Sequence, residues 1–232
     1  DQRDGLNESE LDAVVSRSMA RVEAVRRIEF ERRVPVTVIS RDQFRANHTG
    51  RNYSTADRLH QNTKWEATFI VNESTDALAT QESNRGSSVL GFYSPAREKI
   101  VIVSEDTESP DLNEITLAQE LYHALQDQAF DAYEQDWYPG RTIEEHNAAD
   151  GVIEGDGNYV DYLYEERCGG EWNCLEPAQP GGGGGGDINV GMFLTNYQPY
   201  SDGTAFVKRL HEQAGWDAVN DLYSNPPAST EQ

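Results

Sequence analysis

The sequence has few basic residues, and lysine is the scarcest of them. Only 19 of its 232 residues are Lys or Arg, and three of these are Lys, whereas 41 are Asp or Glu, so the formal net charge is −22. Phosphate backbones would repel so acidic a chain, which excludes nucleic acid as the expected partner. An acid-rich, lysine-poor composition is typical of extreme halophiles, because molar salt shortens the Debye length to about 3 Å and screens repulsion between carboxylates. The alternative is an acidic protein that works at ordinary salt.

Cysteine is also rare, with only Cys168 and Cys174, in the stretch R-C-G-G-E-W-N-C. A structural zinc site takes four ligands, so two cysteines alone argue against one, and the glycine pair between them permits the tight loop of a local disulfide. A disulfide indicates an oxidising, extracytoplasmic location, at the cell surface or secreted. Sequons for N-glycosylation agree with that location and lie at Asn7, Asn47, Asn52 and Asn72.

Long hydrophobic runs are absent as well. No stretch approaches the roughly 18 apolar residues that a membrane-spanning helix needs, so we expect no transmembrane segment. The length is sufficient for a sizeable core, and we expect a single domain over residues 1–232. The glycine run within 180–187 cannot form a packed element, and we predict a flexible loop or linker there.

Hydrophobic periodicity predicts both helices and strands. β-Branched, alternating segments predict one strand at 34–40 and two more around a Ser94-Pro95 turn within 91–104. The segment 65–80 fits either kind of element, and we predict a helix there. Apolar residues three and four positions apart predict the remaining helices, at 9–30, 111–130, 143–164, 203–213 and 216–223.

Residues 118–125 read A-Q-E-L-Y-H-A-L, which differs from the zinc-binding motif H-E-x-x-H only at its first position. On a helix, Gln119 and His123 are one turn apart and point the same way. In the complete motif, two imidazoles at this spacing bind zinc and the intervening Glu polarises a bound water molecule. Only Glu120 and His123 are left to fill these roles. We expect the polar face of this helix to line a cleft or to face solvent.

A third ligand would have to come from another element. The stretch V-I-E-G-D-G places Glu154 on the helix predicted at 143–164, 31 residues after His123. If the two helices pack antiparallel, Glu154 reaches the same cleft as His123. Asp150, Glu154 and Asp161 share one stripe, however, and in so acidic a chain such a stripe is also the expected solvated face of a helix. Spacing alone leaves both interpretations open.

The strings T-L-A-Q-E-L-Y-H-A-L-Q-D-Q-A-F and I-E-G-D-G resemble the small gluzincin-type zinc metallopeptidases, the minigluzincin-like family, and in particular a haloarchaeal branch of surface proteins. In that family H-E-x-x-H-A-L-Q-D-Q on one helix is followed by an E-G-D/E-A segment that supplies a Glu ligand. The likeness extends to V-P-V-T-V-I-S, G-F-Y-S-P and P-Y-S-D-G-T-A-F-V, and to N-P-P-A-S-T-E-Q near the end. It therefore covers most of the chain.

The resemblance implies an α+β fold in which a small, mostly antiparallel β-sheet packs against the zincin-type active-site helix and further helices. An edge strand of that sheet would bind an extended peptide or protein. By position, His123 and Glu154 match metal ligands and Glu120 matches the general base. Gln119 stands where the family has its first histidine ligand.

The amide of Gln119 is a weak, neutral oxygen donor that suits hard cations better than zinc. We therefore expect weakened zinc binding and lost or residual peptidase activity, in a surface protein that serves in binding or in the cell envelope. One alternative is an active zinc metallopeptidase cleaving extended peptides, which tolerates Gln119 or recruits a ligand such as His146. Another is an acidic surface module whose likeness to the motif is accidental. Tyr197 and Tyr200 are candidate donors to an oxyanion, or else packing residues.

Overall fold

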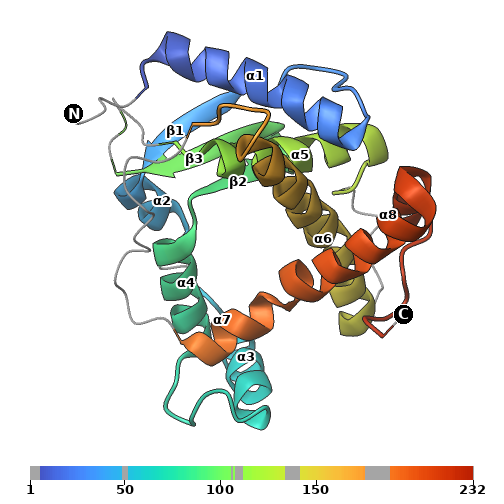
Figure 1. Ribbon diagram of the computed structural model, residues 1–232. Helices are drawn as coiled ribbons and strands as arrows, with labels where there is room; N and C mark the ends of the chain where they lie inside the picture. Colours follow the sequence, from blue (N-terminus) through green and yellow to red (C-terminus); the bar gives the residue numbers. More distant parts are fainter. Residues whose placement is uncertain are drawn as a thin grey trace.

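The computed structural model describes residues 6–48, 52–105, 107, 112–133, 142–175 and 189–231. Within these ranges the chain forms helices and one small sheet, which lies toward the top of Figure 1. The predicted flexible segment at 180–187 lies outside them. None of the helices in the described ranges is both long and apolar enough to cross a membrane.

Three short strands form one sheet: β1 (Val36–Ser40), β2 (Gly91–Ser94) and β3 (Lys99–Ser104), in the order β1-β3-β2. β1 pairs parallel to β3, with Val36 opposite Ile100, and β2 pairs antiparallel to β3. The predicted α+β class is confirmed, but the expectation of a mostly antiparallel sheet is wrong, because one of its two pairings is parallel. A parallel pairing needs a long crossover connection, and the helices between β1 and β2 provide it.

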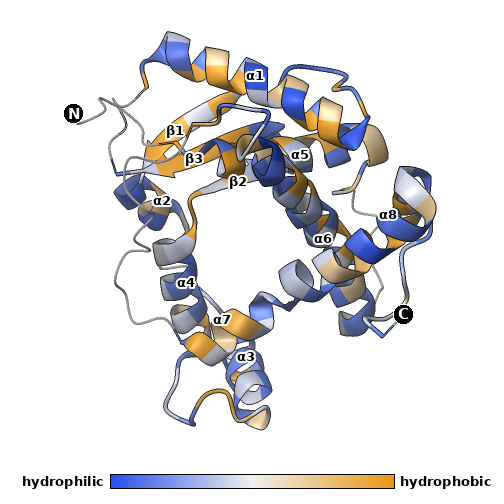
Figure 2. Ribbon diagram, viewed as in Figure 1, coloured by the Kyte–Doolittle hydropathy of each residue, from blue (hydrophilic) through white to orange (hydrophobic). Residues whose placement is uncertain are grey.

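The central strand β3 and two long helices build the core that positions the candidate site. β3 carries four consecutive buried β-branched residues, Ile100–Val103. Helix α5 (Glu114–Phe130) packs against β2 and β3, and helix α6 (Ile143–Cys168) packs alongside α5. Figure 2 shows hydrophobic residues gathered on β1 and β3, while much of the helical surface is hydrophilic. The helix with the Q-E-x-x-H segment is therefore held between the sheet and a second helix.

Helix α1 (Glu8–Arg26) packs on both α5 and α6. Its buried residues include Val14 and Val22, which join the largest hydrophobic cluster of the described residues. The helix ends four residues before the predicted limit of 30, because Arg27 has a left-handed conformation, with φ 62°.

Helix α2 (Arg41–His48) packs against β1 and β3, whereas a group of further helices lies away from the main core: α3 (Thr55–Ala67), α4 (Ala77–Ser88) and α7 (Val190–Asn196). The prediction of a single helix at 65–80 is wrong. α3 ends at Ala67, and α4 begins only after Asp76, whose side chain accepts a hydrogen bond from the N–H of Ala79. The cap at Asp76 therefore starts a new helix within the segment that apolar periodicity predicts as one helix.

Helix α8 (Gln198–Ser224) crosses α6 at close range. It begins five residues before the predicted 203, and it is interrupted at Gly215, whose φ of 77° matches the predicted break before 216. At the crossing, a Cβ on Gly155 would lie 2.3 Å from the carbonyl carbon of Gly203. The two backbones are therefore in direct contact, which only glycine permits.

Candidate functional site

Two pairs of polar side chains join α5 to α6. The Nε2 atom of His123 lies 3.4 Å from Oε2 of Glu154, and Nε2 of Gln119 donates a hydrogen bond of 2.9 Å to Oδ1 of Asn158. Gln119 and His123 are four positions apart on α5, and Glu154 and Asn158 are four positions apart on α6, which in each case is about one helical turn. Because the earlier residue of one helix pairs with the later residue of the other, the two helices run antiparallel. We call Gln119, His123, Glu154 and Asn158 the α5–α6 seam. It brings together three of the residues predicted from the sequence, Gln119, His123 and Glu154, and adds Asn158.

His123 is enclosed rather than facing solvent, with 6% of its surface exposed. Its Nδ1 atom is 2.8 Å from Oε1 of Gln126 and 3.0 Å from the hydroxyl of Tyr133. A Cβ on Gly157 would come within 2.9 Å of the imidazole ring, so that glycine makes room for the ring. Burial lowers the pKa of His123, but the nearby carboxylate of Glu154 outweighs it, and the pKa rises to about 9.

Gln119 is held by hydrogen bonds rather than left free for an ion. Its amide nitrogen donates to Asn158, and Nδ2 of Asn158 in turn donates to the backbone carbonyl of Tyr200 at 3.3 Å. The amide chain thus links α5, α6 and the first turn of α8. The side chain at position 119 thus serves as a structural link.

Glu120 points toward the sheet. Its Oε2 accepts a hydrogen bond of 2.7 Å from the backbone N–H of Tyr93 on the edge strand β2, and a Cβ on Gly91 would lie 3.5 Å from its Cγ. Burial raises the pKa of Glu120, although His123 and the N–H of Tyr93 oppose that shift. The polar face of α5 therefore packs between β2 and α6, where His123 is buried and does not face solvent as expected, whereas Glu120 is partly exposed.

Glu154 contacts a third element, α8. Burial raises its pKa, but His123 and then Tyr200 favour the charged form, so its pKa lies below the usual value. Its Oε2 atom is buried and, apart from the ion pair with His123, has no hydrogen-bond partner among the described residues. Of the two candidate tyrosines, Tyr200 stands beside this carboxylate. Tyr197 is 44% exposed and its ring stacks between Phe193 and Tyr200.

The stripe predicted on α6 is divided between different surroundings. Glu154 belongs to the seam, whereas Asp161 lies two turns further on, where burial raises its pKa to about 7. Asp161 Oδ1 is buried and has no hydrogen-bond partner among the described residues. The alternative ligand His146 lies on α6, eight residues before Glu154.

The donor set does not fit a zinc site with three protein ligands. His123 and Glu154 offer one imidazole nitrogen and one carboxylate oxygen, while the third position holds an amide engaged with Asn158. Within the described ranges, no group of three or more His, Cys, Asp or Glu side chains is placed to hold a metal ion. Zinc in proteins takes at least three such ligands.

A buried hydrogen-bond network that the sequence did not predict begins at Gln126, the residue that contacts Nδ1 of His123. Nε2 of Gln126 donates to the hydroxyl of Tyr223 at 2.6 Å, and that hydroxyl donates to Asp156 at 2.9 Å. Asp156 forms an ion pair with Arg26 at 3.1 Å, and both side chains are fully buried. These partners come from α1, α5, α6 and α8, so no local pattern could have predicted them. Asn158 could have been found, because it follows Glu154 by the same four residues that separate Gln119 from His123.

The predicted disulfide between Cys168 and Cys174 is formed at the end of α6, with 5.4 Å between the two Cα atoms. All four sequon asparagines, Asn7, Asn47, Asn52 and Asn72, are exposed. Asn7 also caps α1 by accepting a hydrogen bond from the N–H of Glu10. Glycosylation at these positions stays a prediction.

Comparison of the chain with protein-family models, with curated proteins and with solved structures gives no significant match. The α5–α6 seam and the sequence motifs are therefore the features of the chain that bear on its function.

Proposed function

We propose that this chain is an extracytoplasmic surface protein of a halophile, built on a gluzincin-like scaffold whose metallopeptidase centre is degenerate, and that it binds polypeptide without hydrolysing it. The observation that carries the proposal is the convergence of His123 and Glu154, 3.4 Å apart on two antiparallel helices, with an amide one turn away at Gln119. An accidental likeness to the motif gives no reason for these side chains to meet.

The chemistry of position 119 supports loss of hydrolysis. Zinc lowers the pKa of a bound water molecule from about 16 to about 7, and a peptidase of this class needs that activated water. With one imidazole and one carboxylate as ligands, the metal is held weakly, and Glu120 is occupied by the N–H of Tyr93. Glu120 therefore makes a structural hydrogen bond and does not activate a water molecule as the nucleophile.

The proposed polypeptide partner would add to the edge of the sheet. β2 is an edge strand, and extended peptides bind such edges through main-chain hydrogen bonds. In the absence of a partner, Glu120 satisfies the N–H of Tyr93. A peptide that pairs with Tyr93 must displace this carboxylate.

The proposed location rests on three features of the chain. The Cys168–Cys174 disulfide suits an oxidising compartment, the sequon asparagines are accessible to modification, and the net charge of −22 suits high salt.

Metal analysis of Gln119→His tests the proposal. In molar salt we expect substoichiometric zinc and no cleavage of a fluorogenic peptide by the unaltered chain. Gln119→His should bind about one zinc per chain, because it restores an imidazole one turn from His123. Adding Asn158→Asp should tighten binding further, since a carboxylate orients and polarises the new imidazole.

Two controls make the result specific. Gln213→His introduces the same substitution at an exposed position of α8 and should not raise zinc occupancy. Gln119→His combined with Glu154→Gln should lose the zinc that Gln119→His gains. Stoichiometric zinc with peptide cleavage in the unaltered chain would support the active peptidase, and failure of Gln119→His to gain zinc would rule out the zincin scaffold.

A further inference from the structure

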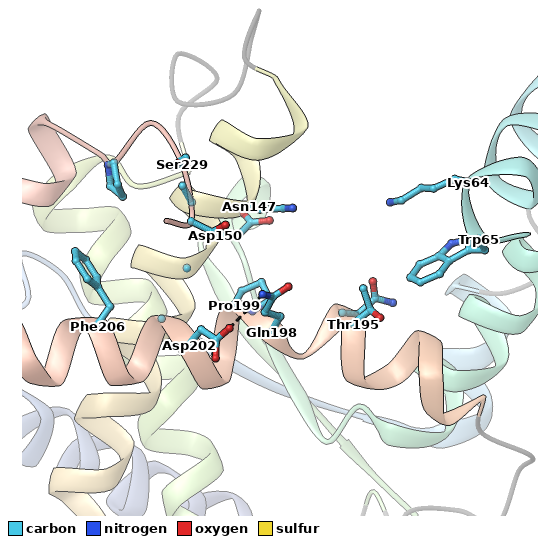
Figure 3. A pocket seen from close by; sticks show the side chains of 16 residues that line it. Lys64, Trp65, Asn147, Asp150, Thr195, Gln198, Pro199, Asp202, Phe206 and Ser229 are labelled. Atoms are coloured by element: carbon cyan, nitrogen blue, oxygen red, sulfur yellow. Dashed lines mark hydrogen bonds between the residues drawn. The ribbon is translucent and has the colours of Figure 1, made fainter. Parts of the chain in front are cut away.

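A cavity of about 290 Å³ lies between α3, α6 and the junction of α7 with α8. Figure 3 shows Lys64 and Trp65 extending from α3 on one side, Asn147, Asp150 and Ser229 on the other, and Thr195 and Gln198 between them. This volume is at the lower end of small-molecule sites. The cavity contains none of the four seam residues.

The walls combine an apolar surface with an unsatisfied donor. Trp65, Pro199 and Phe206 supply aromatic and aliphatic surface. Trp65 is only 1% exposed, and its Nε1 atom is buried without a hydrogen-bond partner among the described residues. A buried indole N–H normally has an acceptor, so its missing partner points to an acceptor on a ligand.

Charges of opposite sign stand on opposite sides of the cavity. Lys64, whose Nζ lies 5.2 Å from the centre of the Trp65 ring, forms no ion pair with any described residue. Across the cavity, Asp150 of α6 and Asp202 of α8 each precede one glycine of the contact between Gly151 and Gly203. Asp202 accepts a hydrogen bond of 3.1 Å from Nε2 of Gln198.

We propose that this cavity binds a short peptide with free termini. The amino group lies between Asp150 and Asp202, the carboxylate accepts from Lys64 and from Nε1 of Trp65, and apolar side chains pack on Phe206 and Trp65. A ligand that carries both a cation and an anion matches the opposite charges on the two walls. In a short peptide the two terminal charges are further apart than in a single amino acid, so a peptide spans more of the cavity. The proposal goes beyond the degenerate metal centre, because it uses neither His123 nor Glu154.

Isothermal titration with the dipeptide Leu-Leu, at a salt concentration where the protein is folded, tests the proposal. Leucine side chains carry no charge, so both charges are at the termini. We expect saturable binding with a dissociation constant of about 1 mM or lower. N-acetyl-Leu-Leu and Leu-Leu amide, each of which lacks one terminal charge, should bind about tenfold more weakly.

Variants test which wall of the cavity binds the carboxylate of the peptide and which wall binds its amino group. Lys64→Gln should weaken Leu-Leu about tenfold and leave the binding of Leu-Leu amide unchanged, since that ligand has no carboxylate. Asp202→Asn should weaken Leu-Leu and leave N-acetyl-Leu-Leu unchanged. Lys208→Gln and Asp221→Asn are matched controls outside the cavity, and Lys208 likewise lies over an aromatic ring, that of Tyr162 at 4.5 Å. Neither control should alter binding.

Three outcomes would overturn the proposal: no saturable binding of Leu-Leu to the folded chain, equal binding of the three ligands, or equal effects of Lys64→Gln and Lys208→Gln. The seam variant Gln119→His should bind Leu-Leu as the unaltered chain does. Failure of the cavity proposal is thus distinguishable from failure of the metal-centre proposal.

Discussion

Position 119 carries an amide, and the side chain opposite it, that of Asn158, is also an amide. Gln119 donates to Asn158, and Asn158 donates to the backbone of Tyr200. A carboxylate at position 158 could only accept, so the second hydrogen bond of this chain depends on an amide there. The two residues therefore form a matched pair that stabilises the packing of α5, α6 and α8 without an ion.

Glu114 is the clearest case in which one buried charge controls stability. Its side chain is fully buried and accepts from Arg17 at 2.5 Å, from Arg21 at 2.6 Å and from the hydroxyl of Tyr164 at 2.7 Å. Burial raises the pKa of Glu114, but these donors outweigh it, and the pKa falls to about 2. Because the pKa is lower in the folded than in the unfolded chain, Glu114 stabilises the fold above about pH 4.5, and this contribution is lost as the pH falls toward 2.

We predict that Glu114→Gln destabilises the protein by about 2 kcal/mol at pH 7, because two arginines lose their carboxylate. The difference in free energy of unfolding from the unaltered chain should shrink below about pH 4.5. Urea titrations at fixed molar salt between pH 7 and pH 3 measure both values. Glu171→Gln, at an exposed position, is the control and should change little. A difference that stays constant over this range would contradict the assignment.

At the scale of elements, the crossing of α6 and α8 determines where Tyr200 stands. Glycines at the crossing allow the two backbones to touch, and this contact holds the first turn of α8 against Glu154. The helices could be predicted separately from their apolar periodicity, but their contact could not. The contact depends on three glycines, Gly151, Gly155 and Gly203. In the sequence each of them indicates only a position that weakens a helix.

We predict that Gly155→Ala destabilises the protein by about 2 kcal/mol, although alanine is the better helix former. The added Cβ would lie 2.3 Å from the backbone of Gly203, which cannot move without displacing α8. Gly170→Ala is the matched control, since a Cβ there meets nothing within 4 Å, and its effect should stay within about 0.5 kcal/mol. Chemical denaturation measures both variants, and equal effects would show that the crossing is not tight.

At the scale of the whole molecule, charge is the dominant property. A net charge of −22 on 232 residues makes the folded state repel itself at low salt. At 0.1 M salt the Debye length is about 10 Å, so neighbouring carboxylates interact, whereas at 1 M it is about 3 Å and they are screened. The buried ion pair of Arg26 with Asp156 is shielded from solvent and is much less sensitive to salt.

We predict that the thermal midpoint rises as potassium chloride increases from about 0.1 M to about 2 M, because screening removes repulsion from the folded state. Circular dichroism measures the midpoint at each concentration. Replacing the exposed residues Glu73, Glu171 and Glu212 by Gln lowers the net negative charge from 22 to 19 and should flatten the dependence. A midpoint that is independent of salt, or that falls as salt increases, would contradict a halophilic surface.

The sequence by itself determined the helices of the core, the three strands, the local disulfide and the acidic surface. Each of these depends on residues close together in the chain or on composition alone. Periodicity failed at 65–80, where the cap at Asp76 separates two helices, and it did not reveal that β1 pairs parallel to β3. Strand order is a property of the crossover connection, about which the strands themselves carry no information.

Only the tertiary structure decided the surroundings of the candidate residues. The sequence identified His123 and Glu154, but their 3.4 Å separation, the amide pair beside them and the network leading to Arg26 result from helix packing. The same packing turns Glu120 toward β2 and opens the cavity beside Trp65. Side chains more than 90 residues apart meet because buried polar groups must find partners, and those partners are set by how the helices pack.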